Sequence, residues 1–175
     1  MAGRDTSLAS AGCPDHREQV RPAWTDRDGY LRPAFLVVIF DHAIDALYEG
    51  LGLGEAYRRE TSFSTFTLET HALLERPIRR GEELLVRNCV LAVDAKRMHI
   101  AQEMFGAQEM VGAEGRVRAA LMEQLSIHVD LAIRRSAPFP PERLARIRAA
   151  IADQRDRPAP AGTGQQIRLD PARSS

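Results

Sequence analysis

Three acid–base side chains lie on the apolar or mixed faces of strand-like segments. Glu123 interrupts a run in which apolar residues alternate, namely Val117, Ala119, Leu121, Leu125, Ile127 and Val129. A carboxylate on such a face must be paired or must line a cavity. Glu69 and His71 share one face of residues 62–74 with Phe63, Thr65 and Thr67. We interpret these three side chains as candidate pocket residues, with an ion pair or a solvated face as the alternative.

Metal chemistry is not indicated by the pattern of ligand-type residues. The histidines do not stand at ligand spacing from cysteines or carboxylates; they are His16, His42, His71, His99 and His128. Cys13 and Cys89 are too few and too far apart for a disulfide framework or a zinc site. The sequence also lacks a glycine-rich phosphate loop. We therefore predict no metal and no cofactor.

Composition restricts the class of protein further. The 175 residues contain 24 Lys+Arg and 24 Asp+Glu, a balance that argues against a nucleic-acid partner. A hydrophobic content of 44% excludes wholesale disorder. No apolar run approaches the roughly 18 residues of a membrane span, and no apolar h-region of a secretory signal follows Met1. We expect a cytoplasmic protein with no membrane association.

The segments that must position these residues follow one another in a simple order. We predict a flexible tail over residues 1–19, one folded domain over 20–152 and a disordered tail over 153–175. The domain opens with a strand at 20–24 and a turn ending at Gly29, and Pro33 then suits the first position of a helix over 34–49. Alternation predicts long strands at 62–74, 84–93, 97–105 and 117–129, and a closing helix at 141–151.

The first half of the predicted central helix, Phe35-Leu36-Val37-Val38-Ile39-Phe40, is apolar on every side. Such a helix must be surrounded by protein. An α+β hot-dog fold, in which a long antiparallel sheet curls around one helix, satisfies this requirement on one side. A second copy is expected to complete the burial, so we predict a homodimer or a homotetramer.

Residues 24–31, Trp-Thr-Asp-Arg-Asp-Gly-Tyr-Leu, resemble the signature of hot-dog thioesterases of the 4-hydroxybenzoyl-CoA thioesterase type. Other matching pieces begin at Phe40, Thr67, Asp94, His128 and Arg134, and they are similar to the thioesterase-like proteins found with carnitine dehydrogenase. The resemblance implies hydrolysis of a small acyl-CoA, with betainyl-CoA as the implied substrate.

The resemblance also assigns roles to individual residues. The family's catalytic carboxylate corresponds to Asp26, as nucleophile or general base, and the helix N-terminus after it offers donors to an oxyanion. Tyr30 stands in place of the motif histidine and is retained as a catalytic candidate that donates a hydrogen bond. The implied substrate-binding residues are Trp24, Gly29, Phe66, Glu69, His71 and Glu123, of which the aromatic and acidic ones suit a trimethylammonium group.

Some family positions carry other residues. Arg32 and Pro33 replace two asparagines, and Leu36 replaces a tyrosine. Pro33 has no N–H, so an oxyanion donor must come from Ala34 or Phe35. These differences leave an alternative function open, a non-catalytic hot-dog protein that binds an acyl-thioester or a carnitine-like ligand. A hydratase or dehydratase is less well supported, because the histidine-containing helix motif of those enzymes is missing.

Overall fold

The computed structural model describes residues 12–106 and 117–167. These residues form an antiparallel sheet with the strand order β1-β3-β4-β5-β2, and β6 pairs with β5. The strands are β1 (His16–Gln19), β2 (Phe63–Leu74), β3 (Glu83–Val93), β4 (Arg97–Gly106), β5 (Arg118–Asp130) and β6 (Arg135–Ser136). The helices are α1 (Pro33–Leu51), α2 (Glu55–Glu60) and α3 (Pro141–Asp153), and Pro22–Trp24 form a 3₁₀ turn. The predicted α+β class is confirmed.

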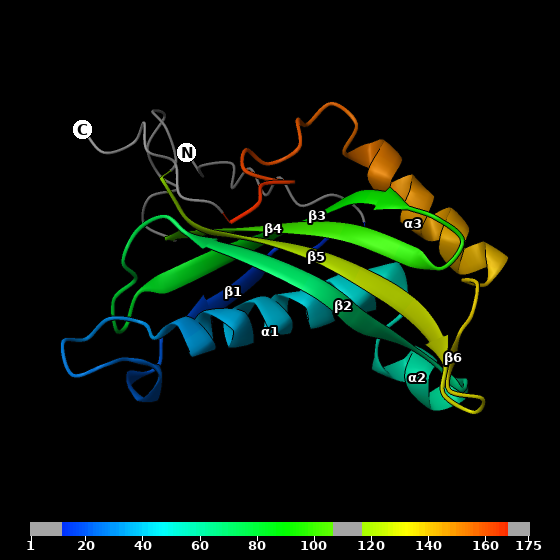
Figure 1. Ribbon diagram of the computed structural model, residues 1–175, viewed down its shortest axis with the longest axis horizontal. Helices are drawn as coiled ribbons and strands as arrows, with labels where there is room; N and C mark the ends of the chain where they lie inside the picture. The colour runs from blue at the N-terminus through cyan, green and yellow to red at the C-terminus, as the bar shows by residue number, and fades with distance from the viewer. Residues whose placement is uncertain (1–11, 107–116, 168–175) are drawn as a thin grey trace, which may run out of the picture.

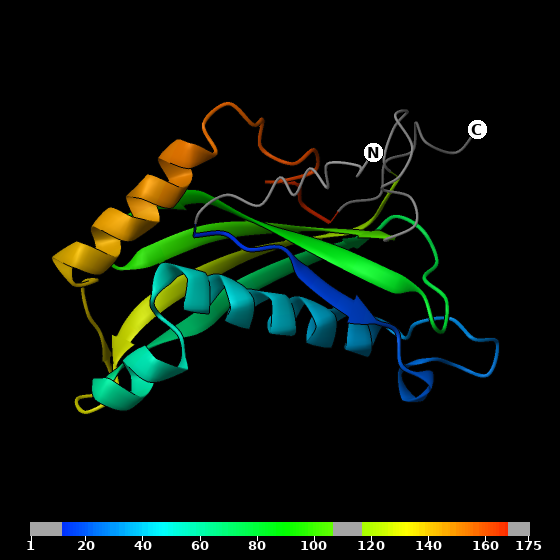
Figure 2. The same ribbon diagram turned by 180° about the vertical axis from the view of Figure 1, so that it is seen from behind.

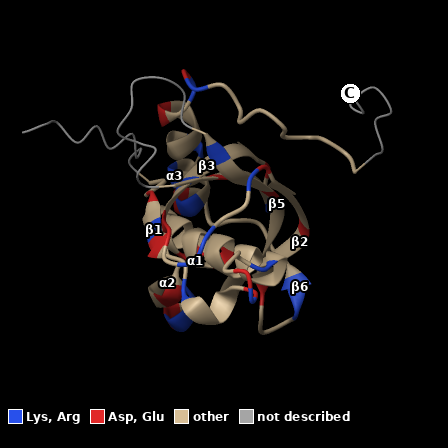
Figure 3. Cartoon of the chain, turned by 90° about the vertical axis from the view of Figure 1, so that its left-hand side faces the viewer, with Lys and Arg blue, Asp and Glu red and all other residues tan. Residues whose placement is uncertain are grey.

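The sheet is curled, and α1 lies against its concave side, as Figures 1 and 2 show from opposite directions. Seen end-on in Figure 3, the edge strands β1 and β2 lie on opposite sides of the helix. Directly opposed residues of neighbouring strands point to the same side of a sheet. The register therefore defines an inner face toward α1, which includes Val86, Asn88, Val90, Ile100, Gln102, Met104, Ala120, Met122 and Gln124. We call the opposite side the outer face.

Helix α1 begins at Pro33 as expected, continues two residues beyond the predicted end at Glu49, and has one clearly apolar side. Pro33 occupies the first helical position, and Gly52 ends the helix with a φ of 73°. The buried side chains recur every three or four residues and are Leu36, Ile39, Phe40, Ala43, Ile44, Leu47 and Leu51. Burial of each large one stabilises the fold by roughly 1.5–3 kcal/mol. Val37 is nevertheless 49% exposed, because a single copy of the sheet covers only one side of the helix.

A second apolar cluster joins α3 to the far end of α1. Ile147 and Ala150 of α3 are buried together with Leu47, Leu51 and Cys13. The six-residue α2, which the sequence analysis did not predict, contributes the buried Tyr57 to the same cluster. None of the helices in the described part of the chain is both long and apolar enough to cross a membrane.

The two ends of the predicted domain differ from the sequence-based boundaries. Strand β1 lies within the predicted tail 1–19, while the predicted strand at 20–24 is largely the 3₁₀ turn. At the other end, the guanidinium of Arg118 donates to the carbonyl oxygen of Ala161 at 2.6 Å. Residues 154–167 thus include a segment bound to the sheet, although we predicted a disordered tail from 153. Residues 1–11 and 168–175 lie outside the described residues.

A β-bulge in β2 changes which side chains share a face. The register with β5 shifts between Thr67 and Glu69, so that Leu68 has no directly opposed partner. Thr67 lies opposite Ser126 on the inner face, whereas Glu69 lies opposite Leu125 on the outer face. The sequence analysis assumed unbroken alternation and placed Glu69 and His71 on one face with Phe63, Thr65 and Thr67. The bulge separates these two groups.

Candidate active site

Asp26 is the centre of a tight turn that leads into α1. Its Oδ1 accepts the backbone N–H groups of Asp28 and Tyr30, each at 2.9 Å. The backbone N–H of Asp26 in turn donates to the carbonyl oxygen of Tyr30 at 2.8 Å, and Gly29 adopts a φ of 83° between them. The hydrogen bond from Tyr30 is the main reason that the pKa of Asp26 is lowered. The carboxylate is therefore ionised at neutral pH and held in a fixed orientation.

The N-terminus of α1 follows this turn without a side-chain cap. The N-cap residue Arg32 makes no side-chain hydrogen bond to the helix. Pro33 has no N–H to offer, and the N–H of Phe35 donates to the carbonyl oxygen of Arg32 at 2.9 Å. Of the two predicted oxyanion donors, the N–H of Phe35 therefore already has an acceptor. The N–H of Ala34 lies in the first turn, where the helix itself provides no acceptor. The helix dipole adds positive potential at the same point.

An apolar cavity of about 360 Å³ opens beside this turn. Its lining includes Tyr30, Pro33, Leu36, Leu74 and Ile78. The hydroxyl of Tyr30 accepts a hydrogen bond from the guanidinium of Arg79 at 3.1 Å, and that guanidinium also lies 4.9 Å from the centre of the tyrosine ring. The catalytic candidate Tyr30 is thus a wall of the cavity, in a position fixed by Arg79.

Trp24 is part of the core near this cavity. Its side chain is buried, stacks on Phe35 with ring centres 6.0 Å apart, and lies 6.3 Å from the ring of His42. The guanidinium of Arg21 lies 4.5 Å from the centre of the indole ring. A cation of the protein itself therefore already occupies the type of position that we predicted for a ligand cation.

Three of the remaining predicted site residues, Glu69, His71 and Glu123, line a second cavity on the outer face. This cavity has a volume of about 590 Å³, and its lining includes Glu69, His71, Glu123 and His99. His99 Nε2 lies 2.6 Å from Glu123 Oε1, and the backbone N–H of Gly164 donates to Glu123 Oε2 at 2.7 Å. The expectation that Glu123 must be paired or line a cavity is met in both respects.

The predicted residues thus form two groups on different sides of the sheet. Asp26, Gly29, Tyr30 and Trp24 belong to the turn before α1, whereas Glu69, His71 and Glu123 line the outer-face cavity. Phe66 is 53% exposed on the outer face of β2 and lines neither of these two cavities. The β-bulge at Leu68 explains why Glu69 and His71 lie apart from the turn at Asp26, because it turns both side chains away from α1.

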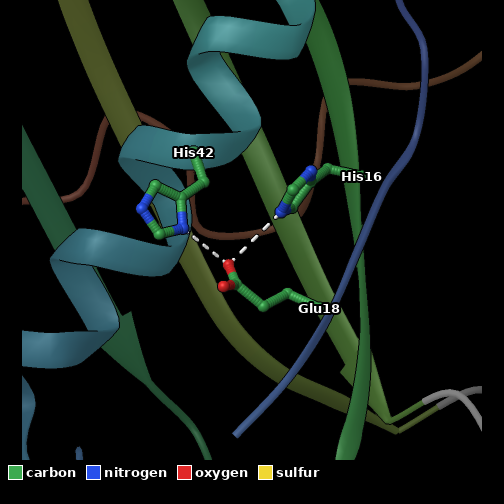
Figure 4. A group of neighbouring side chains, drawn as sticks. All are labelled: His16, Glu18 and His42. Atoms are coloured by element: carbon green, nitrogen blue, oxygen red, sulfur yellow. Dashed lines mark hydrogen bonds and ion pairs between the residues drawn. The ribbon is translucent and has the colours of Figure 1, made fainter. Parts of the chain in front are cut away.

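A third cluster was missed by the sequence analysis. His16 and Glu18 of β1 and His42 of α1 bring their side chains together, as Figure 4 shows. Alternation of His16 and Glu18 places both on one face of a strand, but this signal is visible only once residues 16–19 are recognised as a strand. The sequence gives no indication that α1 contributes a second histidine to the same point.

Comparison with known proteins places the chain in a family. Residues 20–147 match the thioesterase-like superfamily, and the chain belongs to that superfamily. It is 39% identical over 155 residues to a betainyl-CoA thioesterase of Pseudomonas aeruginosa, covering 88% of this chain and 93% of that protein. It is also 30% identical to an L-carnitine dehydrogenase/betainyl-CoA thioesterase of Rhizobium meliloti, covering 85% of this chain and 29% of that longer protein.

Solved structures agree with this assignment. A putative thioesterase from Pseudomonas putida is 32% identical with a TM-score of 0.74, covering 89% of this chain and 95% of that one. A hypothetical protein from Staphylococcus aureus, solved in complex with CoA, has a TM-score of 0.81 at 20% identity, covering 90% of this chain and 96% of that one. The hot-dog fold predicted from the sequence is confirmed.

Proposed function

We propose that this protein is an acyl-CoA thioesterase that hydrolyses betainyl-CoA to betaine and free CoA. The observation that carries the proposal is the position of Asp26. Its ionised carboxylate accepts the backbone N–H groups of Asp28 and Tyr30, and Tyr30 lines the apolar cavity at the uncapped N-terminus of α1. The betainyl-CoA thioesterase of P. aeruginosa, with 39% identity over most of both chains, supports the choice of acyl group.

Thioester hydrolysis needs a nucleophile or base and a group that stabilises the negative charge on the carbonyl oxygen, and the segment before α1 offers a candidate for each. The Asp26 carboxylate either attacks the thioester carbonyl directly or takes a proton from the water that attacks it. The carbonyl oxygen gains negative charge, and the N–H of Ala34 together with the α1 dipole stabilises it. The C–S bond then breaks and the thiolate of CoA leaves. The thiolate takes up the proton held by Asp26 on the general-base route, or a proton from solvent on the nucleophilic route. Hydrolysis of the mixed anhydride regenerates Asp26 if the carboxylate was the nucleophile.

Replacement of Asp26 by asparagine tests this role without removing the turn. An asparagine Oδ1 can accept the same two N–H groups as the carboxylate, so Asp26→Asn should keep the native fold. We expect it to lower kcat/KM by about 10²–10⁴-fold, the usual contribution of a positioned acid–base group. Asp28→Asn is the matched control, because it removes an exposed carboxylate from the same turn and should leave turnover unchanged. Full activity in Asp26→Asn would refute the assignment.

A pair of substrates tests the acyl group. Betainyl-CoA and 3,3-dimethylbutyryl-CoA have the same shape, but only the first carries a positive charge. Release of free thiol should be faster from betainyl-CoA, because aromatic rings and carboxylates favour a quaternary ammonium group. Equal rates would leave a general small acyl-CoA thioesterase and would remove betainyl-CoA from the proposal.

A non-catalytic binding protein is the second candidate function. The observation that favours it is that Tyr30, which replaces the motif histidine, is held by Arg79 and that Pro33 offers no N–H to the substrate. Calorimetric binding of an acyl-CoA without any release of thiol would support this candidate and contradict the first.

We further propose that the protein functions in the cytoplasm as a homodimer or homotetramer. Strand β2 pairs with β5 alone among the described residues, which leaves its other edge open. Phe66, Leu68 and Leu74 on β2 and Val37 on α1 are 49–54% exposed. A long open edge with apolar side chains is an unfavourable surface for a monomer. Cys13 and Cys89 are reduced rather than joined in a disulfide, which supports a reducing compartment.

A further inference from the structure

The cluster of His16, Glu18 and His42 has the composition and geometry of a metal site. His42 Nδ1 lies 2.7 Å and His16 Nε2 lies 3.3 Å from the same carboxylate oxygen, Glu18 Oε2. All three ligand-type atoms lie within 4.8 Å of one another. In Figure 4 both imidazole rings turn a nitrogen toward the carboxylate of Glu18. One nitrogen from each ring and one carboxylate oxygen thus converge on a small volume between β1 and α1.

The backbone segments that carry the two histidines are fastened to each other by one buried amide. Asn88 Nδ2 donates to the carbonyl oxygen of Pro14 at 2.8 Å and to that of Ala43 at 3.0 Å. Pro14 precedes His16 by two residues, and Ala43 follows His42 directly. The Asn88 side chain is 1% exposed, so water does not compete effectively for these bonds. The separation of the two imidazoles is therefore set by the core of the protein.

We propose that His16 Nε2, Glu18 Oε2 and His42 Nδ1 bind a divalent transition-metal ion of the zinc type. Two imidazoles and one carboxylate are common ligands of Zn²⁺, Co²⁺ and Ni²⁺. Zinc–ligand bonds near 2.0–2.1 Å in a tetrahedral arrangement separate the ligand atoms by about 3.3 Å. The His16–Glu18 distance already has this value, and a shift of roughly half an ångström in the His42 ring brings the second distance to it.

The surrounding charges allow a dication at this position. Arg21 is a neighbouring cation, and its guanidinium donates to the other oxygen of Glu18, Oε1, at 3.0 Å. Oε2 therefore remains directed at the two histidines. Asp41 and Asp45 lie on the same helix as His42, and the Asp45 carboxylate interacts electrostatically with both Asp41 and His42. Asp45 therefore adds negative potential at His42, and Arg58 interacts with Asp45 in turn. The half-exposed His42 side chain leaves an approach from solvent.

A bound ion would join the weakest edge of the sheet to the central helix. Strand β1 has four residues and pairs only with β3 among the described strands. The ion would connect two side chains of this strand to α1, and its binding free energy would add to the stability of the fold. The site takes no part in the proposed hydrolysis, so metal binding and thioesterase activity can be tested separately.

The experiment measures metal binding by the untagged full-length chain after treatment with a chelator. Zn²⁺ is titrated by calorimetry, and Co²⁺ is titrated while its visible d–d bands are recorded. We expect one ion per chain with micromolar or tighter affinity, Co²⁺ bands typical of low coordination, and a rise in Tm with Zn²⁺. Failure of the native chain to bind either ion at one per chain would overturn the proposal, whatever the variants do.

Variants separate this site from ordinary surface histidines. His42→Gln removes one ligand at a half-exposed position and should weaken binding by at least about tenfold, since even indirect supporting residues contribute that much. Glu18→Gln should do the same. The matched control is His99→Gln, because His99 forms an equally short contact to Glu123 on the outer face. Binding that survives in His42→Gln but is lost in His99→Gln would refute the assignment.

Discussion

Two buried amides connect the sheet to α1, and their removal gives a sharp test of how the fold positions its site. Gln102 Nε2 donates to the carbonyl oxygen of Phe40 at 3.1 Å and to Asn88 Oδ1 at 2.9 Å. Asn88 in turn donates to Pro14 and Ala43. The perturbation is Asn88→Leu and Gln102→Met, singly and together, because each replacement keeps the volume and removes the polar atoms.

The hydrogen-bond network determines the expected magnitudes. Asn88→Leu removes three of these hydrogen bonds and Gln102→Met removes two, one of which is shared. At about 1 kcal/mol for each bond, the free energy of unfolding should fall by about 3 and about 2 kcal/mol. The double variant loses the shared bond only once, so its cost should be about 4 kcal/mol, with a coupling of about 1 kcal/mol.

The assay is urea unfolding of the metal-free protein, followed by the fluorescence of Trp24, the only tryptophan of the chain. The m-values must agree among variants for the comparison to hold. A control cycle pairs Asn88→Leu with Gln124→Met, since Gln124 bonds to Thr67 and Ser126 in a separate group. That pair should be additive within about 0.5 kcal/mol. Strict additivity of Asn88→Leu and Gln102→Met would refute the reasoning.

Four further predictions concern pH, a buried hydrogen bond, assembly and ligand binding. Burial lowers the pKa of His128 in the folded protein, so the unfolded chain takes up a proton at higher pH, and the free energy of unfolding should decline as pH falls below about 6.5. Tyr57→Phe removes the hydroxyl near His128 Nε2 and should lower the free energy of unfolding by about 1–3 kcal/mol at neutral pH. Urea titrations between neutral and acidic pH check both effects, and a stability independent of pH would contradict the first. Leu68→Lys adds a charge to the open edge of β2 and should lower the mass measured by light scattering, whereas an unchanged oligomer would exclude this edge from the interface. Trp24→Ala should weaken betaine binding in calorimetry if the indole contacts the ligand, and equal affinity would show that Arg21 already occupies that ring.

Regular patterns in the sequence predicted the fold well. The three- and four-residue spacing of Leu36, Ile39, Phe40 and Ala43 directly reflects one-sided burial. Alternation in β5 predicted the strand but not its buried side, because the buried positions in its second half include the polar residues Gln124, Ser126 and His128. The short elements were not predictable in this way. Strand β1 has the polar sequence His-Arg-Glu-Gln and forms because β3 offers it a partner. Such a strand depends on a tertiary contact, for which a local sequence carries no signal.

The candidate site was predictable only where the local sequence determines the local structure. The turn at Asp26 is such a case, because an aspartate before a glycine accepts the N–H groups of its own turn. The location of Glu69 and His71 was not, because one unpaired residue, Leu68, reverses the side on which all later residues of β2 project. The meeting of Glu18 and His42 depends on the packing of α1, which strand alternation does not specify.

The bulge at Leu68 also has a consequence for how this surface can change in evolution. Deletion of that single residue would restore regular pairing with β5 and leave Glu69 and His71 on their present side, because Thr67 and Glu69 already lie opposite the adjacent residues Ser126 and Leu125. Loss of the bulge with Leu68 retained would instead pair Leu68 with Leu125 and move Glu69 and His71 from the outer cavity to the helix side of the strand. An alignment with a relative that lacks the bulge residue therefore needs a one-residue gap at Leu68, because an ungapped alignment compares side chains from opposite faces of the sheet.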